Sequence, residues 1–342
     1  FNHFCTMHNL VQYRHFALIF LLFTAFVGCK KKETNADPST PSGNAALDKL
    51  NAQIEKSPRN AELYYARAEE FFNLEGFDEA IADLNKAISI DSTKADYYHL
   101  LADAYLDYFK SFKALKTMET AASRFPQRIP TLLKLAEFQM ILKLHEESMR
   151  SIDRVLKIDP QNAEAFFMFG MNFKQTGDTA RAINSFQTAV ENDPDLVDAW
   201  INLGQLHAAL GNSIAERYFQ TATRIDPKNI EALHAQGYYL QSIGDLKASL
   251  AVFRKINRID PEYAEGYFNA GLLLMDMDSI PSAYEKFDAA IKASPVHIQA
   301  FFYRGVAAEI MGKTAQAKAD YAQALKLSPD YGKAREGLER VQ

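Results

Sequence analysis

Residues 163–196 read AEAFFMFGMNFKQTGDTARAINSFQTAVENDPDL, and this stretch contains the pattern that organises most of the chain. Its proline, Pro194, belongs to a series with a spacing of 34 residues. The series consists of Pro58, Pro126, Pro160, Pro194, Pro227, Pro261, Pro295 and Pro329. Ser92 fills the one vacant slot, and a single residue is missing before Pro227. A fixed period of this length indicates a repeat architecture.

Eight units follow from this period: 61–94, 95–128, 129–162, 163–196, 197–229, 230–263, 264–297 and 298–331. Within each unit, position 8 is alanine or glycine, position 20 is alanine or serine, and positions 4 and 24 are large. Apolar residues at positions 4, 8 and 11 form the stripe of one helix, and those at 20, 24 and 27 form the stripe of a second. The small residues allow the two helices to approach closely. Gly177, Gly211, Gly244 and Gly312 stand where the first helix must end.

Because these columns agree over eight units, residues 61–329 resemble the tetratricopeptide repeat (TPR) family. The resemblance implies an all-α fold, an α-solenoid that winds as a right-handed superhelix of helix-turn-helix repeats at 61–331. Residues 44–60 and 332–342 carry apolar residues at helical spacing, and we expect them to form N- and C-terminal capping helices. No repeat can bury its apolar stripe alone, so stability must come from stacking.

The first 43 residues have the composition of a targeting signal followed by a flexible tether. Met7 is the first plausible start, and the apolar run 16–27 is shorter than the roughly 20 residues that span a bilayer. The end of that run, before Cys29, resembles the lipobox of bacterial lipoproteins, although Phe26 departs from the usual leucine. We therefore predict a signal peptide at 1–28, lipidation of Cys29 and a flexible tether at 29–43. An ordinary signal peptide or a retained anchor is the alternative. The start of the tether is faintly similar to export tags of Bacteroidota surface lipoproteins.

Composition and motifs argue against several functions. The formal net charge of -5 and the pI near 6.0 provide no basic field for nucleic acid. The two cysteines, Cys5 and Cys29, precede the repeats, which excludes a disulfide or thiolate site within them. No two histidines stand at the spacing of a zinc motif, and His207 occupies a packing column. No phosphate-binding loop or nucleophile elbow occurs. We therefore expect no catalytic residue, no metal and no cofactor, and we predict that the chain is not an enzyme.

The TPR resemblance also implies where partners bind, because the first helix of each pair faces the concave side of such arrays. Position 5 would then form a largely apolar ribbon suited to an extended segment or an amphipathic helix. The alternative is that position 5 packs against neighbouring helices. The candidate groove residues are Tyr65, Glu69, His99, Asp103, Leu133, Glu137, Phe167, Met171, Ile201, Asn202, His234, Tyr238, Phe268, Asn269, Phe302 and Tyr303.

The expected groove is acidic toward the N-terminus. Repeats 1 to 3 contribute the acids Glu62, Glu69, Asp96, Asp103, Asp107 and Glu137, against Lys134 alone. This imbalance predicts that a basic or neutral segment binds there. Asn202 and Asn269, at position 6, resemble the groove asparagines that bind peptide backbone in related arrays. Position 5 has no lysine, so the basic clamp of chaperone-binding TPR proteins is absent.

Together these patterns favour a non-catalytic scaffold or adaptor that is anchored in the bacterial envelope through acylated Cys29. The expected location is the outer membrane, on its periplasmic or surface face, and the expected partners are other proteins and the lipid membrane. The alternative function is a lipoprotein that binds a glycan or a small ligand. It would use Phe167, Phe268, Phe302 and Tyr303 as stacking platforms.

Overall fold

The computed structural model describes residues 44–341, which form 18 α-helices and no strand. A first helix, α2 (Ala45–Lys56), precedes eight helical hairpins, and α19 (Gly332–Arg340) follows them. The first helices of the hairpins are α3 (Ala61–Asn73), α5 (Ala95–Asp107), α7 (Ile129–Ile141), α9 (Ala163–Gln175), α11 (Val197–Ala209), α13 (Ile230–Ser242), α15 (Ala264–Asp276) and α17 (Ile298–Ile310). The second helices are α4 (Phe77–Ile90), α6 (Ser111–Arg124), α8 (His145–Ile158), α10 (Thr179–Asn192), α12 (Ala215–Ile225), α14 (Leu246–Ile259), α16 (Ile280–Ala293) and α18 (Thr314–Leu327). The prediction of an all-α solenoid is confirmed.

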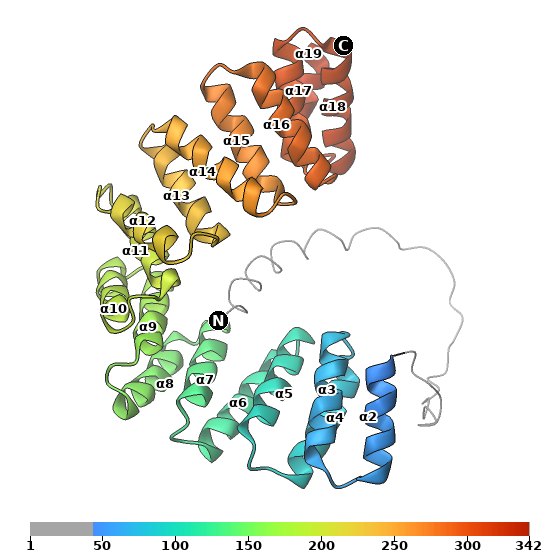
Figure 1. The fold of residues 1–342 in the computed structure, drawn as a ribbon, viewed down its shortest axis with the longest axis vertical. Helices are drawn as coiled ribbons and strands as arrows, with labels where there is room; N and C mark the ends of the chain where they lie inside the picture. Colours follow the sequence, from blue (N-terminus) through green and yellow to red (C-terminus); the bar gives the residue numbers. More distant parts are fainter. Residues whose placement is uncertain (1–43, 342) are drawn as a thin grey trace.

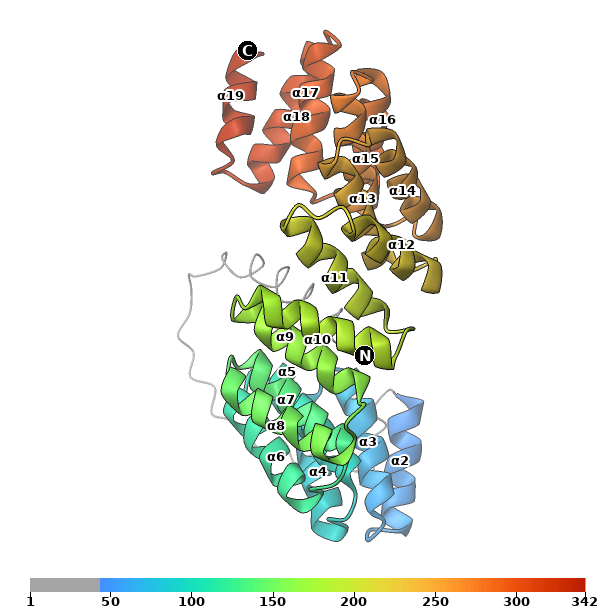
Figure 2. The same ribbon diagram turned by 90° about the vertical axis from the view of Figure 1, so that its left-hand side faces the viewer.

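The hairpins stack into a curved array that is open on one side (Figure 1). Seen from the side, successive hairpins also rotate about the long axis, so the two halves of the stack face different directions (Figure 2). Consecutive first helices contact one another directly, for example α7 with α9 and α11 with α13, whereas consecutive second helices lie farther apart in the described part of the chain. Because the inner helices of a curved stack must be the closer ones, the first helices line the concave face.

Three sequence predictions lie outside the described residues: the signal peptide at 1–28, the lipidated Cys29 and the tether at 29–43. Within residues 44–341, every helix is too short or too polar to cross a bilayer.

Each hairpin is closed by a contact between position 8 of its first helix and position 24 of its second. In the last five repeats position 8 is glycine and position 24 is aromatic, and the ring lies directly against the glycine. A methyl group added at Gly170 would stand 2.5 Å from Cε1 of Phe186, and one at Gly271 would stand 2.5 Å from Cε1 of Phe287. Because both partners are fully buried, the ring fixes the distance between the two helices.

The turn inside every hairpin uses a left-handed residue at position 15. This residue is Gly177, Gly211, Gly244 or Gly312 in four repeats, with φ between 71° and 84°. In the other four repeats Glu75, Phe109, Lys143 and Asp278 adopt φ of 55° to 60°. The backbone therefore requires the same conformation in all eight turns, although only four of them contain the residue that adopts it without strain.

Candidate binding groove

Of the six aromatic or aliphatic residues predicted to form an exposed ribbon at position 5, five are buried and Tyr65 is half-buried. Leu133, Phe167, Ile201, Phe268 and Phe302 are each at most 8% exposed. The ring of Phe268 packs on Phe287, with 5.9 Å between centroids, and Phe302 packs on Tyr321 at 5.8 Å. The expectation of an exposed ribbon is therefore wrong at these positions. In repeats 4, 7 and 8 the ring at position 5 packs on the aromatic ring at position 24, because the close approach of the helices at position 8 brings that ring within its reach.

The burial of these rings bears on the alternative of a glycan site. A sugar stacks on an open ring face, and the faces of Phe167, Phe268 and Phe302 are covered by protein. Tyr303 is half-buried and stacks on Phe287 at 5.7 Å. The rings of Phe167, Phe268 and Phe302 therefore offer no stacking platform, and Phe287 stacks against the ring of Tyr303.

Polar side chains join neighbouring first helices across the concave face. Lys134 Nζ lies 2.8 Å from Asp103 Oδ1, and His99 Nε2 lies 2.9 Å from Thr131 Oγ1. Lys174 Nζ donates to Asn202 Oδ1 at 2.6 Å and to Gln205 Oε1 at 2.9 Å. Burial, together with the charges of Lys134 and Arg128, lowers the pKa of His99 to about 4. The concave face is thus a ladder of mutually bonded groups, which fixes its shape before any partner binds.

The two groove asparagines belong to this ladder. Asn269 is 4% exposed, and its amide lies 3.2 Å from His234 Nε2 and accepts from the Tyr238 hydroxyl at 3.4 Å. Asn202 is half-buried and donates to the Asp198 carbonyl at 2.8 Å. In this conformation Asn269 orients Tyr238, whereas Asn202 keeps part of its surface open.

The acids of the groove divide into paired and unpaired groups. Near the N-terminus Glu62 pairs with Lys94 at 3.8 Å and Asp96 pairs with Arg128 at 3.0 Å. Within residues 44–341 no basic group comes within 4.0 Å of the carboxylates of Glu137, Glu164 and Asp198. Burial raises the pKa of all three carboxyls, and the charge of Lys134 acts in the opposite direction on Glu137. The groove acids without an ion-pair partner within 4.0 Å thus extend over repeats 3 to 5, whereas the sequence predicted an acidic region in repeats 1 to 3.

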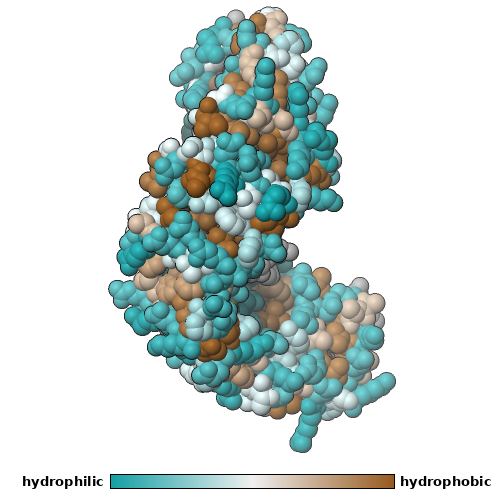
Figure 3. All heavy atoms as spheres, turned by 60° about the vertical axis from the view of Figure 1, so that its left-hand side comes forward, coloured by the Kyte–Doolittle hydropathy of each residue, from teal (hydrophilic) through white to brown (hydrophobic). Residues whose placement is uncertain are grey.

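Several predicted groove residues are open to solvent. Tyr238 is 46% exposed and Glu69 is exposed, while Met171 and Tyr65 are half-buried. Figure 3 looks mainly at the outer side of the stack, where the surface is mostly hydrophilic with scattered apolar side chains. The accessible residues of the predicted groove include a carboxylate, a methionine and two tyrosines, and they do not form a continuous apolar ribbon.

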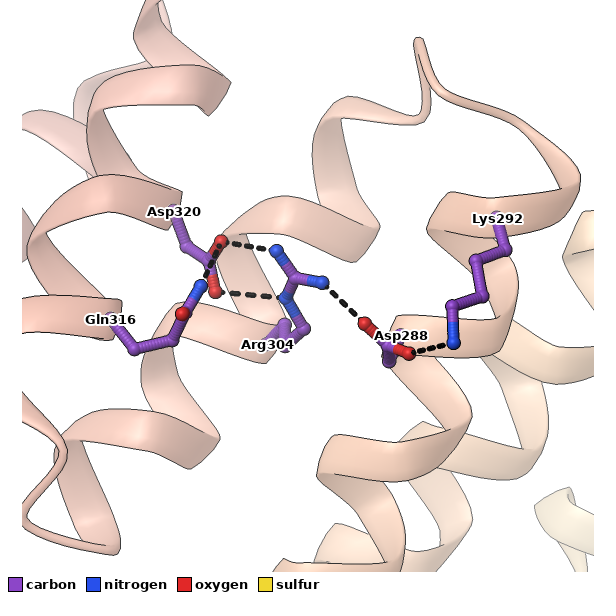
Figure 4. Close-up of polar contacts among 5 residues, drawn as sticks. All are labelled: Asp288, Lys292, Arg304, Gln316 and Asp320. Carbon is purple, nitrogen blue, oxygen red and sulfur yellow. Dashed lines mark hydrogen bonds and ion pairs between the residues drawn. The ribbon is translucent and has the colours of Figure 1, made fainter.

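Two arginine clusters that the sequence analysis missed fasten the ends of the stack. Arg304 forms two bonds to Asp320, at 2.9 and 2.6 Å, and one of 2.6 Å to Asp288 on the preceding second helix (Figure 4). Arg67 repeats this geometry with Asp83 and Asn51, each at 2.7 Å. The signal in the sequence was an arginine at position 7 and an aspartate at position 23, which coincide only in the first and last repeats.

Among the described residues, no three His, Cys, Asp or Glu side chains gather in a way that could hold a metal ion. His207 is half-buried against Tyr218, with ring centroids 5.2 Å apart, and its Nδ1 lies 3.2 Å from the Asn212 amide.

Two family models, both described as tetratricopeptide repeat, match the chain. One matches residues 167–230 and 268–331, and the other matches 61–94 and 230–263. Together the matches cover more than half of the sequence.

Curated relatives share only part of their length with this chain. The human protein O-mannosyl-transferase TMTC1 is 28% identical over 162 residues, which are 46% of this chain and 18% of that protein. The cytochrome c-type biogenesis protein CcmH of Escherichia coli is 37% identical over 90 residues, 25% of this chain and 21% of that protein. Anaphase-promoting complex subunit 3 of Schizosaccharomyces pombe is 25% identical over 54% of this chain and 26% of its own length. The chain thus spans about a quarter or less of each of these proteins.

Solved structures agree in fold at low identity. The C-terminal part of a TPR repeat-containing protein from Cytophaga hutchinsonii superposes with a TM-score of 0.56 and 17% identity, covering 70% of this chain and 99% of that one. The anaphase-promoting complex assembly Cut9-Hcn1 gives a TM-score of 0.52 and 19% identity, covering 86% of this chain and 58% of that one. At such identities the likeness concerns the fold alone.

Proposed function

Because the chain belongs to the tetratricopeptide repeat family, whose members generally mediate protein–protein interactions, we propose that it is a non-catalytic scaffold that holds a partner protein in its concave groove. One observation carries the proposal: the first helices form a preorganised concave surface that retains unpaired carboxylates at its centre. A surface of this kind favours a partner segment with lysine or arginine, because opposite charges across an interface steer and align the partner.

The scaffold acts at the bacterial envelope, where acylated Cys29 anchors it to the outer membrane. The support is the apolar run 16–27 followed by Gly28 and Cys29, and the polar stretch 30–43 that would separate the lipid from α2. Several acyl chains on one cysteine would make such an anchor stable.

The groove is tested by crosslinked affinity capture from membranes with two charge-reversed proteins. The first carries Glu137→Lys, Glu164→Lys and Asp198→Lys on the concave face. The matched control carries Glu119→Lys, Asp153→Lys and Glu191→Lys, which reverse the same number of exposed acids on second helices. We expect the concave variant to lose partners that the control retains. If both variants capture the same partner proteins and both keep the circular dichroism spectrum of the native protein, the groove is not the binding surface.

The anchor is tested separately by fractionation of cells that express Cys29→Ala. We expect the native chain in the membrane fraction and the variant in the soluble fraction. A variant that stays in the membrane fraction would contradict lipid anchoring at this residue and leave the groove proposal untouched.

A further inference from the structure

The concave face contains a hollow of about 390 Å³ between α11 and α13. Its lining residues are Gln205, Ala208, Phe219, Ala235, Tyr238, Tyr239 and Ser242. The floor is the buried ring of Phe219, which lies against Tyr239 at 5.5 Å between centroids. Two alanines on the facing helices leave the space above this floor open. The hollow lies near the small end of the range for ligand pockets, roughly 300–1,000 Å³, and it has room for one large apolar side chain.

The hollow lies beside α12, the shortest of the second helices. This helix has 11 residues, whereas α10 and α14 have 14 each. The residues before Ala215 therefore form turns instead of the first turn of the helix, and the Tyr239 hydroxyl reaches the Ser213 carbonyl at 3.5 Å.

One wall of the hollow is an exposed aromatic ring that is held in place. Tyr238 packs edge-on against His234, with 4.6 Å between centroids, and its hydroxyl donates to Asn269. A large apolar side chain that is both exposed and fixed by a polar contact is a typical anchor for a partner, because little side-chain entropy is lost on binding.

Two charged groups, the Asp198 carboxylate and the ammonium of Lys174 from α9, lie at different points along α11, which lines the hollow. Asp198, at the start of α11, has no basic partner among the described residues. Burial, and then the nearby charge of Glu231, raise the pKa of the Asp198 carboxyl, and a cation beside this carboxyl would favour its charged form. Farther along α11 the ammonium of Lys174 is bonded to Asn202 and to Gln205 at the rim. A cation of a bound segment is therefore favoured toward Asp198 and disfavoured at the rim.

We propose that this hollow is the anchor subsite of the groove and takes a large apolar side chain from an extended protein segment that carries lysine or arginine about three residues away. The spacing follows from geometry, since Gln205 lies seven residues after Asp198 on α11, which is about 10 Å of helix. An extended segment covers this distance in roughly three residues at about 3.3 Å each. The inference rests on the proposed function and names the chemistry of its partner.

The test selects binders of the intact chain from a random peptide library displayed on phage. We expect the selected peptides to share an apolar residue followed or preceded, about three positions away, by lysine or arginine. A synthetic peptide of the selected sequence is then measured by fluorescence anisotropy against three variants. Ala235→Leu fills the hollow, Tyr238→Ala removes its wall, and Ala251→Leu makes the same alanine change on an exposed site of α14.

The subsite requires that Ala235→Leu and Tyr238→Ala each weaken binding by about tenfold or more, and that Ala251→Leu leave it unchanged. Asp198→Asn should weaken binding of the basic peptide. It should leave unchanged the binding of a peptide in which glutamine replaces the lysine or arginine. Equal affinity of all variants for the peptide would overturn the subsite while leaving a groove function intact. Selected peptides rich in acidic residues would overturn the charge assignment. Failure to select any peptide would overturn the subsite, and the membrane capture experiment decides separately whether the groove binds a protein at all.

Discussion

Repeats 1 to 3 and repeats 4 to 8 build the same hairpin with different residues at its closest contact. In the first group position 8 is alanine and position 24 is aliphatic, as in Ala102 with Met118 and Ala136 with Ile152. In the second group glycine faces an aromatic ring, as in Gly170 with Phe186. All of these residues are buried. The two solutions show that the hairpin needs a constant combined volume at this contact, and that the residues are exchangeable only in pairs.

The two groups also differ in their turns. Repeats 1 to 3 place Glu75, Phe109 and Lys143 in the left-handed conformation, whereas repeats 4, 5, 6 and 8 use glycine. Left-handed backbone costs an ordinary residue roughly 1–2 kcal/mol. The N-terminal repeats are therefore expected to be the less stable part of the stack.

The largest effect is expected at the terminal arginine clusters. Arg304→Ala would leave Asp320, which is 2% exposed, with the neutral Gln316 amide in place of an ion pair, and breaking a buried pair costs about 3–5 kcal/mol. Arg67→Ala should cost less, because the carboxylate of its partner Asp83 is more exposed and its other contact, Asn51, is neutral. Urea denaturation followed by circular dichroism measures the free energy of unfolding of both variants. Arg304→Leu combined with Asp320→Leu serves as the control and should recover part of the loss; a larger loss for Arg67→Ala than for Arg304→Ala would refute the ranking.

The paired contact is tested by a double-mutant cycle in repeat 4. Gly170→Ala should destabilise the protein by about 1–3 kcal/mol, because the new methyl group meets the ring of Phe186. Adding Phe186→Leu should make the alanine tolerable, since the pair then resembles Ala68 with Leu84 in repeat 1. The matched change Ala102→Gly in repeat 2 should cost about 1 kcal/mol through helix propensity. Additive effects in the cycle would show that the two positions do not constrain each other.

Acid should destabilise the N-terminal group through His99. The pKa of its imidazole is about 4 in the folded state, against 6.5 for an ordinary histidine. Between these values the unfolded chain binds a proton that the folded chain does not, so stability falls as the pH drops from 6.5 toward 4, by roughly 2 kcal/mol for a partly exposed group. His99→Gln should flatten the dependence of the urea midpoint on pH. An unchanged slope in this variant would assign the effect to other groups.

In the C-terminal group the corresponding histidine is His234. Burial lowers its pKa, whereas the charges of Glu265 and Glu231 act in the opposite direction. His234→Gln is therefore expected to change the dependence of the urea midpoint on pH less than His99→Gln does. A larger change for His234→Gln would contradict this ranking of the two histidines.

The smallest effect is expected in the turns. Lys143→Gly should stabilise the protein by about 0.5–1 kcal/mol, since glycine adopts the left-handed conformation without strain. Gly177→Ala, in the equivalent turn of repeat 4, should destabilise it by a similar amount, although no atom lies within 4 Å of the added methyl group. Thermal unfolding measures the change in stability of each variant relative to the native protein. Opposite signs are required, and the same sign for both would contradict the account of the turns.

The fold was predictable because a period of 34 residues repeats the same packing constraints eight times. The exposure of position 5 was not predictable from its polarity. Phe268 is apolar both in a surface ribbon and in a core, and only the approach of the ring of Phe287 decides between them. The charge pattern was also incomplete, because the pairing of Asp103 with Lys134 depends on the distance between neighbouring first helices. Cys29 is a sequence prediction outside the described residues.

The central claim is that a partner protein binds the concave face, and site-specific photocrosslinking in cells tests it most directly. A benzophenone amino acid is introduced at Gln205, which is exposed on the first helix α11, or at Gln220, which is exposed on the second helix α12 of the same repeat. We expect a covalent adduct with a partner from the Gln205 position and none from Gln220. An adduct from Gln220 alone would place the binding surface on the convex face and rule out binding in the groove.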